Sequence, residues 1–152
     1  MFLLDVCQSL DKNGISYALA GGYAVALHGA VRGTVDVDFV IPWELEQLKA
    51  VEQSMHEIGL VSKLPIDAEQ LFYFKDEFIE KRNMVAWNFY HPKDPSKQVD
   101  LIITYDLGDR KTILKTIGSL AVHVLNKKSL IEMKTQSGRP QDLEDIKALK
   151  QL

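Results

Sequence analysis

The stretch from Ala20 to Ile41, AGGYAVALHGAVRGTVDVDFVI, places a glycine pair before a small-residue helix and two aspartates in an apolar strand. Gly21 and Gly22 follow a short strand predicted in SYALA and precede a helix predicted in YAVALHGA. Because glycine lacks a Cβ, the backbone at this turn lets a phosphate approach closely, and the helix behind it offers free N–H groups. A tight turn explains the pair equally well, and neither G-K-S/T nor G-x-G-x-x-G is present.

Asp36 and Asp38 lie two residues apart in the predicted strand VDVDFVIP, so their carboxylates project from the same face. The opposite face is apolar and is expected to bury against helices: Val35, Val37, Phe39 and Ile41. Two carboxylates this close repel each other unless a cation compensates them, and Mg²⁺ prefers carboxylate and phosphate oxygens. The alternative interpretation of this D-x-D pattern is an exposed edge strand or a salt bridge, for example to Arg32.

Asp100 is a third aspartate in a predicted strand, at the start of the apolar run Leu101, Ile102 and Ile103. A carboxylate at such a position is costly to bury without a partner. If this strand lies beside the Asp36 strand, three carboxylates converge and can hold two divalent ions. One ion would lower the pKa of an attacking hydroxyl, and both would neutralise charge on a transferring phosphoryl group.

Length, charge and cysteine content describe an ordinary globular chain. The chain has 152 residues and a net charge of -3, so we expect a single domain over residues 1–152 and no broad electrostatic footprint for nucleic acid. Cys7 is the only cysteine, which excludes an intrachain disulfide and favours a reducing compartment. No apolar run is long enough to span a membrane, and MFLLDV lacks the basic start of a signal peptide. We therefore expect a cytoplasmic protein with no membrane partner.

Helical and strand patterns are interleaved along the chain. Helices are expected at residues 2–12, 23–30, 43–59, 109–117, 127–136 and 140–152. Strands are expected at residues 16–20, 35–42, 71–78, 83–91, 96–105 and 120–126. Because several strands follow one another directly, the order predicts an α+β (mixed α/β) domain, with a mixed sheet and helices packed on one face.

Together these residues resemble the nucleotidyltransferase superfamily with the polymerase-β-like fold. The shared pattern is a Gly-Gly pair, a short helix, D-x-D on the next strand and a later lone aspartate on a strand. The form is similar to small bacterial members of the AbiEii type and to lincosamide nucleotidyltransferases, and the tail LIEMKTQSGRPQDLEDIKAL is similar to that of AbiEii proteins. The resemblance covers residues 17–41, 99–103 and 130–149, and the middle of the chain carries no motif.

The resemblance implies roles for nine positions. Asp36, Asp38 and Asp100 would be catalytic and would bind two Mg²⁺ ions, with Asp100 acting as the base. The residues implied at the nucleotide are Gly21, Gly22, Arg32, Thr34, Lys134 and Asp142. Simpler explanations exist for the tail: Lys134 as a solvated lysine, Asp142 as a first-turn acid favoured by the helix dipole, and Arg139 pairing with Asp142 or Asp145.

The implied activity is Mg²⁺-dependent transfer of a nucleoside monophosphate from a nucleoside triphosphate to an acceptor hydroxyl. The acceptor class stays open between RNA or tRNA, a protein, and a small molecule such as an antibiotic. The sequence ends at Leu152, whereas many superfamily members carry a further helical domain that holds the acceptor. The alternative is a non-catalytic member that serves as a binding or regulatory partner, for example beside a cognate antitoxin or another helical protein in a toxin–antitoxin pair.

Overall fold

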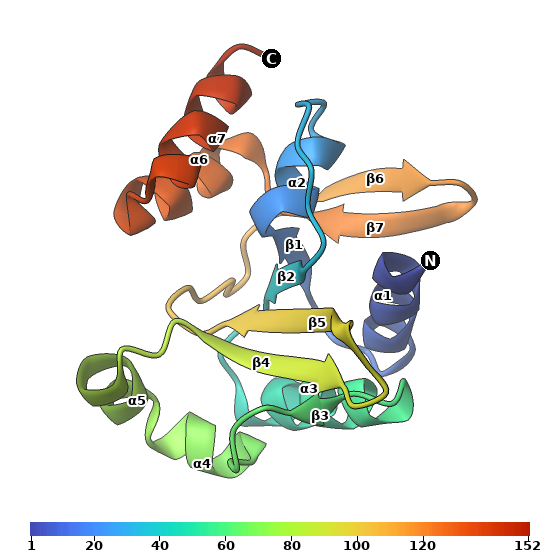
Figure 1. The fold of residues 1–152 in the computed structure, drawn as a ribbon, viewed down its shortest axis with the longest axis vertical. Coiled ribbons are helices and arrows are strands. Elements are labelled where there is room, and N and C mark those ends of the chain that lie inside the picture. Colours follow the sequence, from blue (N-terminus) through green and yellow to red (C-terminus); the bar gives the residue numbers. More distant parts are fainter.

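A seven-stranded mixed sheet runs through the molecule in the order β3-β4-β5-β2-β1-β7-β6 (Figure 1). The structure is a computed structural model that describes all of residues 1–152. The strands are β1 (Ala18–Ala20), β2 (Val37–Val40), β3 (Val61–Ser62), β4 (Ala86–His91), β5 (Asp94–Ile102), β6 (Ile113–Ile117) and β7 (Leu120–Val124). β2 pairs with β5 in parallel and with β1 antiparallel, so strands distant in sequence meet at the centre of the sheet.

Seven helices flank this sheet. They are α1 (Phe2–Lys12), α2 (Gly21–Leu27), α3 (Leu45–Glu57), α4 (Ala68–Tyr73), α5 (Lys75–Arg82), α6 (Lys127–Ser137) and α7 (Pro140–Lys150). α6 and α7 pack together at one end of the long axis, and α4 and α5 lie at the other end (Figure 1). The mixed α/β class expected from the sequence is confirmed, and no helix combines the length and apolarity that crossing a membrane would require.

Alternating burial along β2 and β5 separates a core face from a polar face. Val37, Phe39, Val99 and Leu101 have no exposed surface and belong to one contiguous cluster of 33 buried hydrophobic residues. Asp38 and Asp100 lie between these residues, point to the opposite face and are only partly buried. The expectation that Val35 joins the core was wrong, because it lies ahead of β2 and is 66% exposed.

The strand expected at residues 71–78 is instead the helix pair α4 and α5. A capping box fixes the start of α4: the Asp67 side chain accepts from the backbone N–H of Gln70, and the Gln70 side chain accepts from the backbone N–H of Asp67. Ala68 and Leu71 are buried at i, i+3 spacing, whereas Phe74 is half exposed. The aromatic run favoured a strand locally, but the cap and the helical spacing decide the fold there.

The helix expected at residues 109–117 is also wrong, because β6 forms there and pairs antiparallel with β7. Ile117 pairs with Leu120, which leaves Gly118 and Ser119 as a two-residue hairpin turn. Gly118 has φ +61°, the left-handed conformation that such turns require. The β-branched residues that precede this turn suit a strand better than a helix.

Candidate functional site

Two aspartates and an asparagine form one row across the polar face of the central strands. In the pairing register, Asp38 of β2 lies beside Asp100 of β5, and Asp100 lies beside Asn88 of β4. Ala20 of β1 pairs with Asp38 on the other side, so the row ends where β1 turns into α2. The Asp100 strand therefore lies beside the D-x-D strand, an arrangement that the sequence left open. We call Asp38 and Asp100 the carboxylate pair.

The carboxylate pair is poorly compensated within the protein. Burial, followed by the charges of Asp100 and Asp36, raises the pKa of Asp38 to about 7. Burial also raises the pKa of Asp100, and a hydrogen bond from Asn88 only partly opposes this. None of the three aspartates forms an ion pair, and Arg32 pairs elsewhere, so the salt-bridge interpretation of the D-x-D pattern was wrong.

Asn88 is a residue of this row that the sequence analysis missed. Its Nδ2 donates to Asp100 Oδ1 at 2.8 Å and to Gln98 Oε1 at 3.1 Å, which fixes the orientation of the Asp100 carboxylate. Its Oδ1 is buried without a hydrogen-bond partner, an arrangement that is rare in proteins. The signal in the sequence is an amide between two aromatic residues, Trp87 and Phe89, both of which are fully buried.

The donor set matches the chemistry of Mg²⁺ but is not assembled as a finished site. Asp36 is exposed and lies ahead of β2, and nowhere do three acidic, histidine or cysteine side chains already form a group that could hold a metal ion. Carboxylate and amide oxygens are nevertheless suitable Mg²⁺ ligands, and this cation commonly completes its shell with substrate phosphates and water. The uncompensated charge of the carboxylate pair therefore fits a divalent cation that arrives with a ligand.

The glycine pair allows β1 and α2 to lie directly against the carboxylate pair. Gly21 has φ +61°, and a Cβ there would lie 1.9 Å from Asp38 Oδ2. A Cβ on Gly22 would lie 2.7 Å from Thr34 Cβ and Oγ1 and 3.3 Å from Arg32 Cζ. The absence of both Cβ atoms thus brings the turn into contact with Asp38 and with the segment that precedes it.

A second buried charge cluster joins the α6–α7 pair to the segment between α2 and β2. Lys134 Nζ lies 2.8 Å from Asp145 Oδ2 and 3.6 Å from Asp142 Oδ1. Arg32 Nε donates to Asp145 Oδ1 at 3.0 Å, and Arg139 pairs with Asp142 rather than with Asp145. We call these five residues the tail cluster. Lys134 is 5% exposed, so the interpretation of this residue as a solvated lysine was wrong.

The carboxylates of the tail cluster are compensated by their neighbours. Burial alone would raise the pKa of Asp142, but hydrogen bonds from Arg139 lower it to about 2. Burial is likewise outweighed at Asp145, where hydrogen bonds from Lys134, Gln141 and Arg32 lower the pKa. The cluster also lies close enough to the carboxylate pair for Lys134 and Arg139 to oppose the upward shift in the pKa of Asp38.

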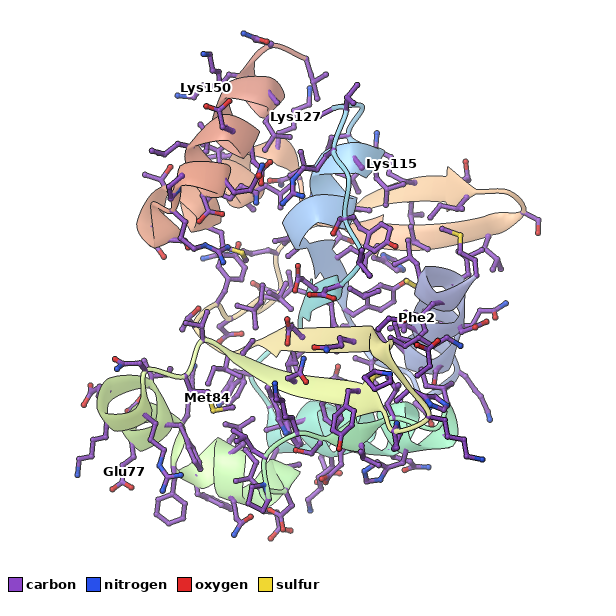
Figure 2. The ribbon with its side chains drawn as sticks, in the orientation of Figure 1. Phe2, Glu77, Met84, Lys115, Lys127 and Lys150 are labelled. Atoms are coloured by element: carbon purple, nitrogen blue, oxygen red, sulfur yellow. The ribbon has the colours of Figure 1, made fainter.

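Two surface hollows lie away from both charge clusters. An open hollow of about 550 Å³ is lined by residues of the β3–α4 connection, α4 and α5, and a smaller one of about 340 Å³ adjoins it at Trp43. Glu77 lines both hollows and lies at the opposite end of the long axis from Lys150 of α7 (Figure 2). The candidate site is therefore identified by its partly buried and buried charged residues, and it does not coincide with either hollow.

The fold is shared with solved nucleotidyltransferase structures. The antibiotic-resistance factor ANT(2'')-Ia matches with a TM-score of 0.66 at 10% identity, over 97% of this chain and 80% of that protein, and another structure of it holds adenylyl-2''-tobramycin. The lincosamide antibiotic adenylyltransferase LnuA, with lincomycin bound, matches with a TM-score of 0.62 at 16% identity, over 98% and 94% of the two chains. An antigenic nucleotidyltransferase-like protein from Paracoccidioides brasiliensis gives 0.59 at 19% identity, over 97% and 72%.

These TM-scores establish the fold, which is that of nucleotidyltransferases, while the low identities leave the chemistry to be argued from this chain's own residues. No family model matches the sequence, and no curated protein matches it.

Proposed function

We propose that this protein is a Mg²⁺-dependent nucleotidyltransferase, which moves a nucleoside monophosphate from a nucleoside triphosphate to an acceptor hydroxyl. The observation that carries the proposal is the carboxylate pair: Asp38 and Asp100 are paired in register, partly buried and without a cation of their own. Two partly buried carboxylates without a cation lower the stability of the folded protein, and a bound ligand that supplies positive charge would offset this cost.

In the proposed reaction the acceptor hydroxyl oxygen forms a bond to the α-phosphorus of the nucleotide. The bond from that phosphorus to the β-bridging oxygen breaks, and pyrophosphate leaves. The hydroxyl proton passes to the Asp100 carboxylate. Asn88 Nδ2 already holds Asp100 Oδ1, so the second carboxylate oxygen is the one available to take this proton.

The other residues of the site would bind the metal ions and orient the triphosphate. Asp38 and Asp100, joined by Asp36, would hold two Mg²⁺ ions, which when bound lower the hydroxyl pKa and offset the phosphate charge. Gly21 and Gly22 would let the triphosphate approach the turn that borders Asp38. Arg32, Thr34, Lys134 and Asp142 lie in the tail cluster or against the glycine turn, and would shape the nucleotide side of the site.

A small hydroxylated molecule is the acceptor class best supported by the fold neighbours, since the structures of ANT(2'')-Ia and LnuA hold a tobramycin adduct and lincomycin. An RNA, a tRNA or a protein acceptor is the competing class. A non-catalytic partner protein of a toxin–antitoxin pair is the competing function.

The test is transfer of label from each of four α-labelled nucleoside triphosphates, with Mg²⁺, to tobramycin, lincomycin, total RNA and the protein itself. We expect the wild type to label one acceptor class, and Asp38→Asn and Asp100→Asn to abolish labelling because each removes a charged oxygen ligand. Asp76→Asn, at an exposed site on α5, is the matched control and should retain full activity. A wild type that neither transfers nor binds any nucleotide with Mg²⁺ would support the non-catalytic partner.

A further inference from the structure

The tail cluster contributes three cationic side chains on the α7 side of the proposed triphosphate site, and they differ in exposure. Lys134 is almost fully buried between Asp142 and Asp145, so its ammonium has two carboxylate partners within 3.6 Å. Arg32 donates from Nε to Asp145 and from Nη1 to the carbonyl oxygen of Gly33. Both cations therefore hold the tail cluster together: Lys134 presents no open charge to a ligand, and the Arg32 side chain is only 24% exposed.

Arg139 is the third cation, and it differs in exposure. Its side chain is 75% exposed, although the Asp142 carboxylate that holds it is 2% exposed. Nε donates to Asp142 Oδ2 at 2.8 Å and Nη2 donates to Oδ1 at 3.2 Å, so one edge of the guanidinium is fixed. A guanidinium has five N–H donors, and two are used here, which leaves three on the outer edge.

A series of contacts links α7, which carries Arg139 at its start, to the carboxylate pair. Asp145, three residues after Asp142 on α7, holds Arg32, and the guanidinium of Arg32 lies against the Gly22 turn. That turn borders Asp38, because Gly21 lies directly against the Asp38 carboxylate. The guanidinium of Arg139 is therefore held in one orientation by Asp142, with its outer edge exposed to solvent on the α7 side of the carboxylate pair. A planar fork of this kind suits bidentate binding of phosphate oxygens.

We propose that Arg139, oriented by Asp142, binds the β- and γ-phosphates of the nucleoside triphosphate, in place of the Lys134 contact that the resemblance implied. The inference rests on the proposed function. It gives Asp142 a positioning role and leaves Lys134 as a structural cation within the tail cluster. Because pyrophosphate retains these phosphates after transfer, the same fork would hold the leaving group.

The experiment measures binding of Mg²⁺–ATP and of Mg²⁺–pyrophosphate to the full chain by calorimetry. Arg139→Gln should weaken both ligands by about tenfold or more, since it removes a charge-assisted pair of hydrogen bonds. Arg139→Lys keeps the charge and can still pair with Asp142, so it should fold like the wild type and bind with intermediate affinity. Lys147→Gln removes one exposed positive charge from the same helix and should bind within about twofold of the wild type.

The outcomes separate the two proposals. If the wild type binds both ligands and Arg139→Gln binds them equally well, the role of Arg139 is overturned while the proposed function stands. Equal weakening in Arg139→Gln and Lys147→Gln would also overturn it, because only net charge would then matter. If the wild type binds neither ligand, the proposed function fails, and the Arg139 inference fails with it. Should Arg139→Gln not fold, the affinity of Arg139→Lys decides: wild-type binding contradicts a forked contact.

Discussion

The carboxylate pair and the tail cluster each contain two aspartates, partly buried in the first and fully buried in the second, and their electrostatic surroundings are opposite. In the tail cluster, Lys134 and two arginines surround Asp142 and Asp145, and the pKa of both carboxyls is lowered. In the carboxylate pair, Asp38 and Asp100 face each other without an ion pair, and the pKa of both is raised. The tail cluster has the charge balance of a structural ion-pair cluster, whereas the weak compensation of the carboxylate pair supports the ligand-dependent role that we propose for it.

We expect the largest effect from a substitution that removes a cation from the tail cluster. Lys134→Met leaves two buried carboxylates with less positive charge, and breaking a buried ion pair in this way costs roughly 3–5 kcal/mol. We expect the free energy of unfolding, measured by urea titration, to fall by about that amount. Lys147→Met on the exposed side of α7 is the control and should change it by less than about 0.5 kcal/mol. Equal losses in the two variants would contradict a structural role for the tail cluster.

A smaller loss is expected where the backbone meets the carboxylate pair. Gly21→Ala introduces a Cβ that would overlap Asp38 Oδ2 and adds strain at φ +61°, which together should cost on the order of 2 kcal/mol. Gly14→Ala is matched in conformation, with φ +70°, but has no atom within 4 Å of the new Cβ. It should lose only about 1 kcal/mol of strain. The difference between the two losses in thermal melts measures the contact with Asp38.

Asp38→Asn should act in the opposite direction to Lys134→Met. It removes a carboxylate that burial and Asp100 disfavour, and each pKa unit corresponds to about 1.4 kcal/mol. After relaxation of this partly buried position, we expect a gain in unfolding free energy on the order of 1–2 kcal/mol at pH 8. Urea titration of both proteins measures it. A loss of stability would mean that Asp38 has a structural partner.

The smallest effect is the pH slope, and its sign follows from the direction of each shift. The pKa of Asp38 is raised from 3.8 to about 7 on folding, so the native state holds more protons between these values. The contribution of Asp38 to the free energy of unfolding is therefore fully present below about pH 4 and is lost as the pH rises through 7. The free energy of unfolding should fall over this range by less than about 1 kcal/mol per pH unit. Asp142, lowered to about 2, contributes above pH 4 and loses this as the pH falls through 2. Unfolding free energies of wild type and Asp38→Asn should converge near pH 4.

The sequence predicted those features of the site that depend on the spacing of neighbouring residues, and missed those that depend on long-range packing. The i, i+2 spacing of Asp36 and Asp38 placed them on a strand, although Asp36 lies just outside it. Strand pairing was open, so nothing in the sequence identified Asn88 as the neighbour of Asp100. Arg32 and Asp145 are 113 residues apart, and only the packing of α7 against the α2–β2 segment brings them together. The error at α4 arose where a capping box overrode the strand preference of the aromatic run, whereas at β6 the β-branched residues and the hairpin turn both favour the strand that forms.

If the carboxylate pair binds Mg²⁺ together with a nucleotide, Mg²⁺–ATP should raise the melting temperature of the protein. Thermal melting with and without Mg²⁺–ATP therefore tests the proposed site most directly. Wild type should be stabilised by mass action, by about 2.7 kcal/mol at a hundredfold excess of ligand over Kd. Asp38→Asn and Asp100→Asn should melt at or above the wild-type temperature without ligand and respond far less to it, while Asp76→Asn should respond like the wild type. An unshifted wild type, or a shift retained in both carboxylate-pair variants, would contradict the account.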